Sequence, residues 1–353
     1  MRIGIGSGGW YVLLLTGALL LPGCGAPAAP QTSAPPAAQP PNDAARSVPL
    51  TPLRVGYSAA SGTWAPLFVA AEAGLFEKYG LAIELVPLFG TQGPQAMVAG
   101  NVPLMALGGT SAAPSMVEGA DLVMVLAAIN RMTLQIYGVS TVESPQALKG
   151  KRLAITRPGT LTYFGGRLAL RELGLKPDED VAIVSLNDSA GVLAGVLGGA
   201  ADAGVLTDPF TLLARKQGLH LLVDLAYSPT EYLVAGVTTT HAYVKNDRPT
   251  LLSFLKGWME GTKRYWDDRE LAIAALSKYT EIDDREVLAE SYDLYANYFA
   301  RDPTPGAQSM QNILTDYADA NPKAREVDPA RTVDPSLIED LRREGFLRSL
   351  GLE

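Results

Sequence analysis

Short apolar segments alternate with helical segments from residue 53 onward, and this alternation constrains the fold more than any other feature. Four apolar segments are expected to be strands, at residues 53–58, 83–88, 104–107 and 122–127. Helices are expected between them, at residues 66–73, 95–99 and 111–118. Strands that are apolar along their whole length are covered on both faces, which is typical of parallel α/β sheets. The sequence therefore predicts an α/β fold.

The same alternation starts again after Ser144. Strands are expected at residues 148–155, 181–186, 203–206 and 219–226, with helices at residues 163–173, 191–197 and 210–217. Residues 232–244 are interpreted as an extended return to the first unit. We therefore expect two lobes, one formed by residues 51–140 and 238–353 and the other by residues 141–237. Closure is expected to hinge near residues 139–144 and 232–237.

The last third of the chain is predicted to be helical. Apolar residues fall on one helical face in two stretches, which we interpret as core-facing stripes rather than ligand sites. The first contains Leu251, Leu255, Trp258, Thr262 and Trp266, and the second contains Leu288, Tyr292, Tyr295 and Phe299.

The first fifty residues differ from this pattern. Residues 1–23 contain an apolar run that is too short to span a membrane and is typical of a secretory signal peptide. Cys24, the only cysteine, follows this run and resembles the lipid-modified cysteine of a bacterial lipobox, although Pro22 is unusual there. Residues 24–50 are rich in proline and alanine and are expected to form a disordered tether. The alternative is a signal peptide cleaved nearby, with Cys24 incidental. On either interpretation the folded part works outside the cytoplasm.

Polar, glycine-rich segments follow the predicted strands. In open parallel sheets, ligands bind beyond the carboxyl ends of the strands, where helix N-termini offer free N–H groups. These segments supply the candidate ligand-binding residues Ser58, Ser61, Trp64, Thr91, Gln92, Gly109, Thr110, Ser111, Asn130, Arg157, Gly159, Thr160, Thr162, Asn187, Asp188 and Asp208. The same residue types also cap helices and form turns, so capping alone remains an alternative for each segment.

Three of these residues have a specific expected role. Trp64 would stack on an aromatic ligand, or simply pack between the lobes. Arg157 would clamp an anionic group, or form a surface or interlobe ion pair. Asp208 would accept a hydrogen bond from a ligand N–H group, or start a helix in the sequence Thr-Asp-Pro.

Several stretches resemble one known family. Residues 70–81, followed by 83–85, are similar to the opening motif of nitrate, sulfonate, taurine and thiamine-precursor binding proteins. Residues 99–104, 148–155 and 198–203 fit the same family in order and spacing. The resemblance implies a type II periplasmic-binding-protein fold. It also implies a monomer that carries a small organic molecule, such as a sulfonate, a carboxylate or a pyrimidine, to an ABC permease with a separate ATPase.

The sequence disfavours other functions. A formal net charge of −8 does not suit nucleic-acid binding, which needs a basic face. His220 and His241 are the only histidines, so no histidine-pair metal site or serine–histidine–aspartate set is visible. We expect no enzyme activity, no cofactor and no metal. A sensor of the same fold that presents its ligand to a receptor remains an alternative.

Overall fold

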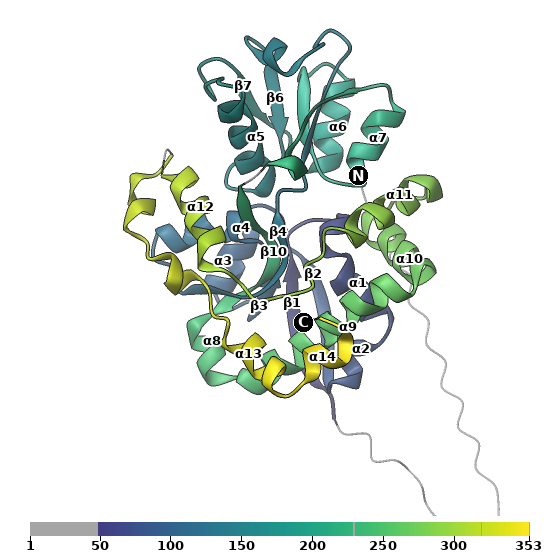
Figure 1. Ribbon diagram of the computed structural model, residues 1–353, viewed down its shortest axis with the longest axis vertical. Coiled ribbons are helices and arrows are strands. Elements are labelled where there is room, and N and C mark those ends of the chain that lie inside the picture. The colour runs from purple at the N-terminus through teal and green to yellow at the C-terminus, as the bar shows by residue number, and fades with distance from the viewer. Residues whose placement is uncertain (1–48, 229, 319, 353) are drawn as a thin grey trace, which may run out of the picture. The chain divides into compact units, whose positions relative to one another are not determined.

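The computed structural model describes residues 49–228, 230–318 and 320–352, which form one compact unit. The predicted signal peptide, Cys24 and nearly all of the predicted tether lie outside the described residues. Two five-stranded sheets organise this unit, with helices against each of them (Figure 1). The expected α/β class is thereby confirmed.

The first sheet has the strand order β2-β1-β3-β10-β4. Its strands are β1 (Thr51–Tyr57), β2 (Leu81–Pro87), β3 (Leu104–Ala106), β4 (Leu122–Arg131) and β10 (Glu231–Thr240). β1 is parallel to β2 and β3, as the apolar pattern predicts, but β10 runs antiparallel between β3 and β4. The predicted return segment is thus a central strand of this sheet.

The second sheet has the order β7-β6-β8-β5-β9. Its strands are β5 (Gln135–Gly138), β6 (Arg152–Ile155), β7 (Ala182–Ser185), β8 (Ala203–Leu206) and β9 (His220–Asp224). β6 pairs in parallel with β7 and β8, whereas β5 is antiparallel to β8 and β9. Each sheet therefore contains one antiparallel strand that joins it to the other lobe.

The expected lobe boundaries at residues 140 and 237 are wrong. β5 was expected in the first lobe but lies in the second sheet, and β10 starts at Glu231 in the first sheet. The chain passes between the sheets at residues 132–134, and again after β9 ends at Asp224 and before β10 begins at Glu231, so the expected hinges are displaced as well. Strand pairing decides sheet membership here, and pairing is not encoded in the local apolar pattern.

The helices of the first lobe that precede the crossing are α1 (Ala65–Glu72), α2 (Leu75–Lys78), α3 (Gln92–Val98) and α4 (Gly109–Val117), with the 3₁₀ turn η1 (Gly62–Trp64) before α1. The second lobe contains η2 (Pro145–Leu148), α5 (Leu161–Glu172), α6 (Ser189–Leu197), α7 (Phe210–Lys216) and η3 (Leu225–Tyr227). Its helices α5, α6 and α7 follow β6, β7 and β8, so their N-termini lie at the carboxyl ends of those strands.

The C-terminal third returns to the first lobe and is helical, as predicted. It contains α8 (His241–Asn246), α9 (Arg248–Asp267), α10 (Arg269–Thr280), α11 (Arg285–Ala296), α12 (Ala307–Tyr317), η4 (Pro322–Glu326), η5 (Pro329–Thr332), α13 (Ser336–Arg343) and α14 (Phe346–Leu350). Both predicted stripes face the core, where Trp258 and Tyr295 are almost fully buried and only Trp266 is partly exposed.

Close backbone contacts fix these helices against the first sheet. A Cβ atom on Gly261 of α9 would lie 2.5 Å from the carbonyl oxygen of Pro66, so only glycine allows α9 to approach α1 this closely. Farther along the chain, residues 300–303 and Asp334 hydrogen-bond to the outer edge of β4 through backbone atoms. The C-terminal segment therefore covers an edge that would otherwise be open.

Candidate functional site

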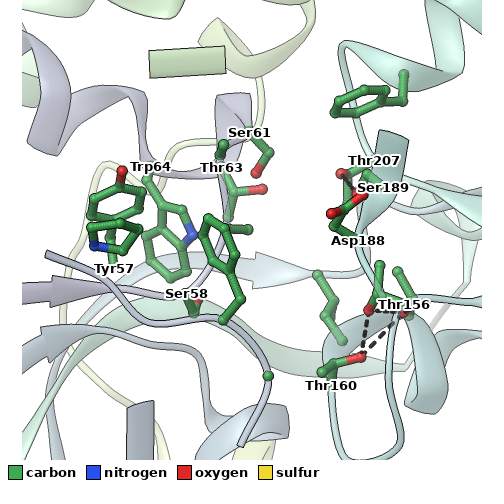
Figure 2. A pocket seen from close by; sticks show the side chains of 18 of the residues that line it. Tyr57, Ser58, Ser61, Thr63, Trp64, Thr156, Thr160, Asp188, Ser189 and Thr207 are labelled. Atoms are coloured by element: carbon green, nitrogen blue, oxygen red, sulfur yellow. Dashed lines mark hydrogen bonds between the residues drawn. The ribbon is translucent and has the colours of Figure 1, made fainter. Parts of the chain in front are cut away.

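A cavity of about 440 Å³ lies between the two lobes. Figure 2 shows Tyr57, Ser58, Ser61, Thr63 and Trp64 on one side of it, and Thr156, Thr160, Asp188, Ser189 and Thr207 on the other. It is lined by residues 57–61, 63, 64, 87, 89, 90, 108, 111 and 234 of the first lobe, 156, 160–162, 187–190, 207 and 210 of the second, and 279–281 at the end of α10. Its size falls within the range of small-molecule sites.

The carboxyl ends of the strands position this lining. Tyr57 ends β1, and Thr156 and Thr207 directly follow β6 and β8. Gly108 precedes α4 and packs so closely on β10 that a Cβ atom there would lie 1.8 Å from the carbonyl oxygen of Val234. Glycine at this position lets the N-terminus of α4 reach the cavity, which is the arrangement expected at the strand ends of open α/β sheets.

Threonine hydroxyls form a fixed polar surface in the second lobe. The Oγ1 atom of Thr156 lies 2.9 Å from that of Thr160 and 2.7 Å from that of Thr162. Thr160 donates to the carbonyl oxygen of Arg157, and Thr162 accepts from the backbone N–H of Thr156. Because the loop holds these hydroxyls in place before any ligand arrives, little ordering entropy is lost when they bind one.

Aromatic rings form the opposite wall. The ring of Tyr57 meets Phe89 edge to face, with centroids 6.3 Å apart, and Phe68 in the same way at 5.4 Å. Tyr279 stacks on Phe68, with ring centroids 4.2 Å apart. These rings therefore connect the end of α10 to the end of β1. Such a wall suits a planar or apolar ligand surface.

Trp64 adds a polar group to this wall. Its side chain is 3% exposed, and its indole N–H has no hydrogen-bond partner among the described residues. A buried donor without an acceptor is costly, so this nitrogen would gain from an acceptor atom supplied by a ligand or by water.

The charged side chains that line the cavity are acidic. Its lining contains Asp188 and Glu281 but no lysine, arginine or histidine. Asp188 caps α6 by accepting a hydrogen bond of 2.8 Å from the backbone N–H of Gly191. Burial, and secondarily the carboxylate of Glu281, raise the pKa of Tyr57. Glu281 therefore lies close enough to the aromatic wall to influence it electrostatically.

Some of the residues predicted to bind ligand do line the cavity: Ser58, Ser61, Trp64, Ser111, Thr160, Thr162, Asn187 and Asp188. Others lie close by but outside the lining: Thr91, Gln92, Gly109, Thr110, Asn130, Arg157, Gly159 and Asp208. Thr91 and Gln92 are exposed, Gly109 and Thr110 are buried in the first turn of α4, and a Cβ atom on Gly159 would lie 3.4 Å from the ring of Pro114 in α4.

Arg157 does not face the cavity, because other groups bind its guanidinium. Its Nη1 donates to the carbonyl oxygen of Phe89 at 2.9 Å, and its Nε donates to Oδ1 of Asn187 at 3.0 Å. Arg157 and Asn187 belong to the second lobe and Phe89 to the first. The alternative interlobe role expected from the sequence thus fits this arrangement better than an anion clamp.

Asp208 is also absent from the cavity lining. It is 1% exposed, its Oδ1 accepts a hydrogen bond from Thr211, and its Oδ2 has no partner among the described residues. Burial, with a smaller contribution from Asp224, raises its pKa to about 7. Its backbone carbonyl accepts from the N–H of Gly62, which makes it a second contact between the lobes.

Sequence reasoning missed several lining residues. Tyr57 and Phe89 lie where a predicted strand gives way to a polar loop, so their position was visible in the sequence. Only the polar residues near them were predicted to bind ligand. Thr63, Ser189, Thr207 and Phe210 lie in the predicted loops or beside them. Tyr279, Thr280 and Glu281 gave no signal, because the C-terminal helices bring them to the cavity from about 200 positions further along the chain.

Ion pairs connect the lobes beside the cavity. In α7, Arg215 pairs with Glu290 of α11, and Lys216 pairs with Asp284 at 2.9 Å and Glu286 at 2.6 Å. On the other side, Arg171 of α5 pairs with Asp316 of α12 at 2.5 Å. The lobes are therefore held in contact on both sides.

Among the described residues, no three histidine, cysteine, aspartate or glutamate side chains are grouped as a metal site would need. Neither histidine lines the cavity. Within the same residues, no helix has the length and apolar character needed to cross a bilayer.

Comparisons with known proteins agree with this architecture. YtlA of Bacillus subtilis (strain 168) is 21% identical over 268 residues, which cover 72% of this chain and 79% of YtlA. The periplasmic aliphatic sulphonate binding protein SsuA of Escherichia coli superposes with a TM-score of 0.68 at 23% identity, covering 80% of this chain and 92% of SsuA. The periplasmic nitrate-binding protein NrtA of Synechocystis PCC 6803 superposes with a TM-score of 0.71 at 15% identity, covering 86% and 91%.

These superpositions confirm the periplasmic-binding-protein fold that the sequence motifs imply. The family described as NMT1/THI5 like matches residues 62–270, which is more than half of the chain. The protein therefore belongs to the NMT1/THI5-like family.

Proposed function

We propose that the protein is an extracytoplasmic solute-binding protein that delivers a small organic molecule to an ABC-type importer. The observation that carries the proposal is one cavity lined by the strand-end loops of both lobes. A molecule held there contacts both lobes at once, so its binding free energy stabilises the closed arrangement over the open one. The buried, unpartnered indole N–H of Trp64 indicates that the cavity still has hydrogen-bonding capacity for such a molecule.

The comparisons support the transport role. SsuA is a periplasmic aliphatic sulphonate binding protein and NrtA is a periplasmic nitrate-binding protein. Another similar structure, from Staphylococcus aureus, is the ligand-binding component of an ABC-type import system. In our proposal, the closed lobes present a surface to the permease, and a separate ATPase hydrolyses ATP. The two crossings, at residues 132–134 and between β9 and β10, act as the hinge.

A cavity-filling substitution tests the binding role. Ala190 lines the cavity at the start of α6, and Ala190→Trp should occupy the space that a ligand needs. A compound that stabilises the native protein by about 2.7 kcal/mol at 100 times its Kd should lose most of that stabilisation in the variant. Thermal unfolding measured against a library of sulfonates, carboxylates, amines and pyrimidines provides the readout.

The matched control is Ala194→Trp, which adds the same side chain to an exposed position of the same helix, outside the cavity. It should retain the full ligand-induced shift. If Ala190→Trp bound every compound as the native protein does, the cavity would not be the binding site and the proposal would fail.

We also propose that Cys24 is diacylated and anchors the protein to the outer face of a bacterial membrane. The support is the apolar run that precedes this single cysteine and the proline-rich stretch that follows it. Mass spectrometry of the N-terminal peptide from bacterially expressed protein should show two acyl chains on a glyceryl-modified Cys24. The variant Cys24→Ala should move from the membrane fraction to the soluble fraction. An unmodified cysteine, or a cleavage site elsewhere, would overturn the anchor and leave the binding role intact.

A further inference from the structure

Glu281 occupies an unusual backbone position at the edge of the cavity. It follows α10 directly and has φ 57° and ψ 30°, which is the left-handed region. Glycine, and sometimes asparagine, is the usual residue at such a helix end, because a Cβ atom is strained there. A glutamate at this position carries strain that helix termination does not require, and backbone strain of this kind gathers at functional sites.

The carboxylate of Glu281 is exposed and available. It has no hydrogen bond or ion pair to another residue of the described chain, whereas Asp188, the other carboxylate of the lining, is occupied in capping α6. The two residues before it also serve the site, since Tyr279 and Thr280 line the same cavity. Glu281 is thus the only charged side chain of the lining that is free to meet a ligand.

The surroundings of Glu281 favour a positive partner. The lining contains no lysine, arginine or histidine that could neutralise it, and the nearest cationic candidate expected from the sequence, Arg157, is held by Phe89 and Asn187. The aromatic rings of Tyr57, Phe89 and Tyr279 lie in the same lining. Aromatic faces attract cations through their quadrupole, in addition to packing against planar groups.

An anionic ligand would be less well accommodated. The N-termini of α4, α5 and α6 carry partial positive charge, but Asp188 already offsets that of α6. A sulfonate or carboxylate would then lie in a cavity with two carboxylates and no cationic side chain. The net field at the lining therefore favours a neutral or positive molecule.

We propose that Glu281 is a specificity-determining residue that selects a ligand with a protonated nitrogen, such as an amine, an amidinium or an aminated ring, whose planar body lies against the aromatic wall. The inference rests on the proposed solute-binding function and names its ligand class. The hydroxyls of Thr156, Thr160 and Thr162 remain available for neutral polar groups at the other end of the same molecule. The ligand class thus differs from the sulphonate and nitrate named for SsuA and NrtA.

Three probes of nearly the same shape separate charge from size. Benzamidine, benzamide and benzoate share a phenyl ring and a planar three-atom substituent, and at neutral pH they are cationic, neutral and anionic. Benzenesulfonate extends the anionic arm. Isothermal titration calorimetry on the purified protein should give the tightest binding for benzamidine, weaker binding for benzamide and the weakest for the two anions.

The substitution Glu281→Gln keeps the shape of the side chain and removes its charge. It should weaken benzamidine binding by about tenfold or more, because a hydrogen bond between charged groups is lost, and it should change benzamide binding by about twofold or less. Glu339→Gln, on the exposed side of α13 and outside the cavity, is the matched control and should change neither.

A second variant distinguishes recognition from helix termination. Glu281→Gly relieves the left-handed strain, so it should raise the melting temperature of the ligand-free protein while losing benzamidine binding as Glu281→Gln does. A residue with a purely structural role would not produce this opposite pair of effects.

The outcomes separate the inference from the proposed function. Tighter binding of benzoate or benzenesulfonate than of benzamidine, or unchanged benzamidine affinity in Glu281→Gln, would overturn the charge preference. If that anion binding were lost in Ala190→Trp, solute binding in the cavity would still stand. Failure of all four probes to bind would also overturn the ligand class proposed here, and the wider compound library would then decide the function on its own.

Discussion

Asp208 places an ionisable group inside the protein at the contact between the lobes. Its carboxyl is 1% exposed, and only one of its oxygens has a partner among the described residues, the hydroxyl of Thr211. Desolvation disfavours the charged form, and Asp224 adds a like charge, so the pKa rises from 3.8 to about 7. Between about pH 4 and pH 7, Asp208 of the folded protein therefore holds a proton that the unfolded chain has released.

This shift predicts how stability depends on pH. Because its pKa is raised in the folded state, Asp208 adds to the free energy of unfolding. This stabilising contribution is fully present below about pH 4 and is lost as the pH rises to about 7. Asp208→Asn cannot titrate, so its free energy of unfolding should improve relative to the native protein by up to about 1.4 kcal/mol per pH unit across that window. Chemical denaturation at a series of pH values measures the difference.

The control for this prediction is Asp178→Asn, an exposed aspartate in a surface ion pair with Arg167. Its stability difference from the native protein should stay nearly constant between pH 5 and pH 7. A constant difference for Asp208→Asn as well would show that Asp208 is ionised throughout.

Individual site residues were predictable where loop chemistry alone decides their position. The hydroxyls of Thr160 and Thr162 line the cavity because they belong to a strand-end loop that precedes a helix. Arg157 lies in the same loop, but its long side chain turns toward the carbonyl oxygen of Phe89 in the other lobe. The direction of a flexible side chain depends on partners that are distant in sequence, and the local pattern does not contain them.

At the scale of elements, the helices α7 and α11 make the most direct contact between the lobes. Arg215 and Lys216 close the C-terminal turn of α7, and they face acidic residues of α11 and of its N-terminal cap. All these side chains are partly exposed, so each pair is worth only about 0–1 kcal/mol. Because they join parts that must separate for a ligand to enter, even this small energy shifts the balance between open and closed forms.

The double variant Arg215→Ala with Lys216→Ala should favour the open form in the absence of ligand. At low ionic strength we expect the closed population to fall by about two- to fivefold, seen in small-angle X-ray scattering as a larger radius of gyration. At about 1 M salt, where screening acts over roughly 3 Å, the difference from the native protein should largely disappear.

Lys176→Ala serves as the control, because Lys176 pairs with Glu179 within the second lobe. It should leave the scattering unchanged at both salt concentrations. Equal radii for the double variant and the native protein at low salt would show that these ion pairs do not hold the lobes together.

At the scale of the whole molecule, the sequence predicted two α/β lobes and a helical C-terminal third, because apolar strands, glycine-terminated helices and amphipathic stripes are local features. It predicted the return of the chain to the first lobe at residues 232–244, but not that β5 and β10 pair antiparallel with their neighbours inside the two sheets. Both segments have the pattern of ordinary strands, and their partners are set by contacts between residues as far apart in sequence as Leu104 and Thr239. The position of Glu281 was missed for the same reason, since α10 reaches the cavity only after the chain has passed through both lobes.

The central position of β10 in the first sheet also affects the order in which the protein can form. The second sheet is built from one continuous stretch, β5 to β9, whereas β10 lies between β3 and β4, which precede it by more than a hundred positions. As a growing chain appears from its N-terminus, the inserted lobe is complete while the earlier one still lacks β10, one of its interior strands. Long-range pairings of this kind form slowly and leave unpaired strands exposed in the meantime. The export that we propose would benefit from that delay, because a first sheet that is completed late leaves the polypeptide for longer in the unfolded form that a secretion channel accepts.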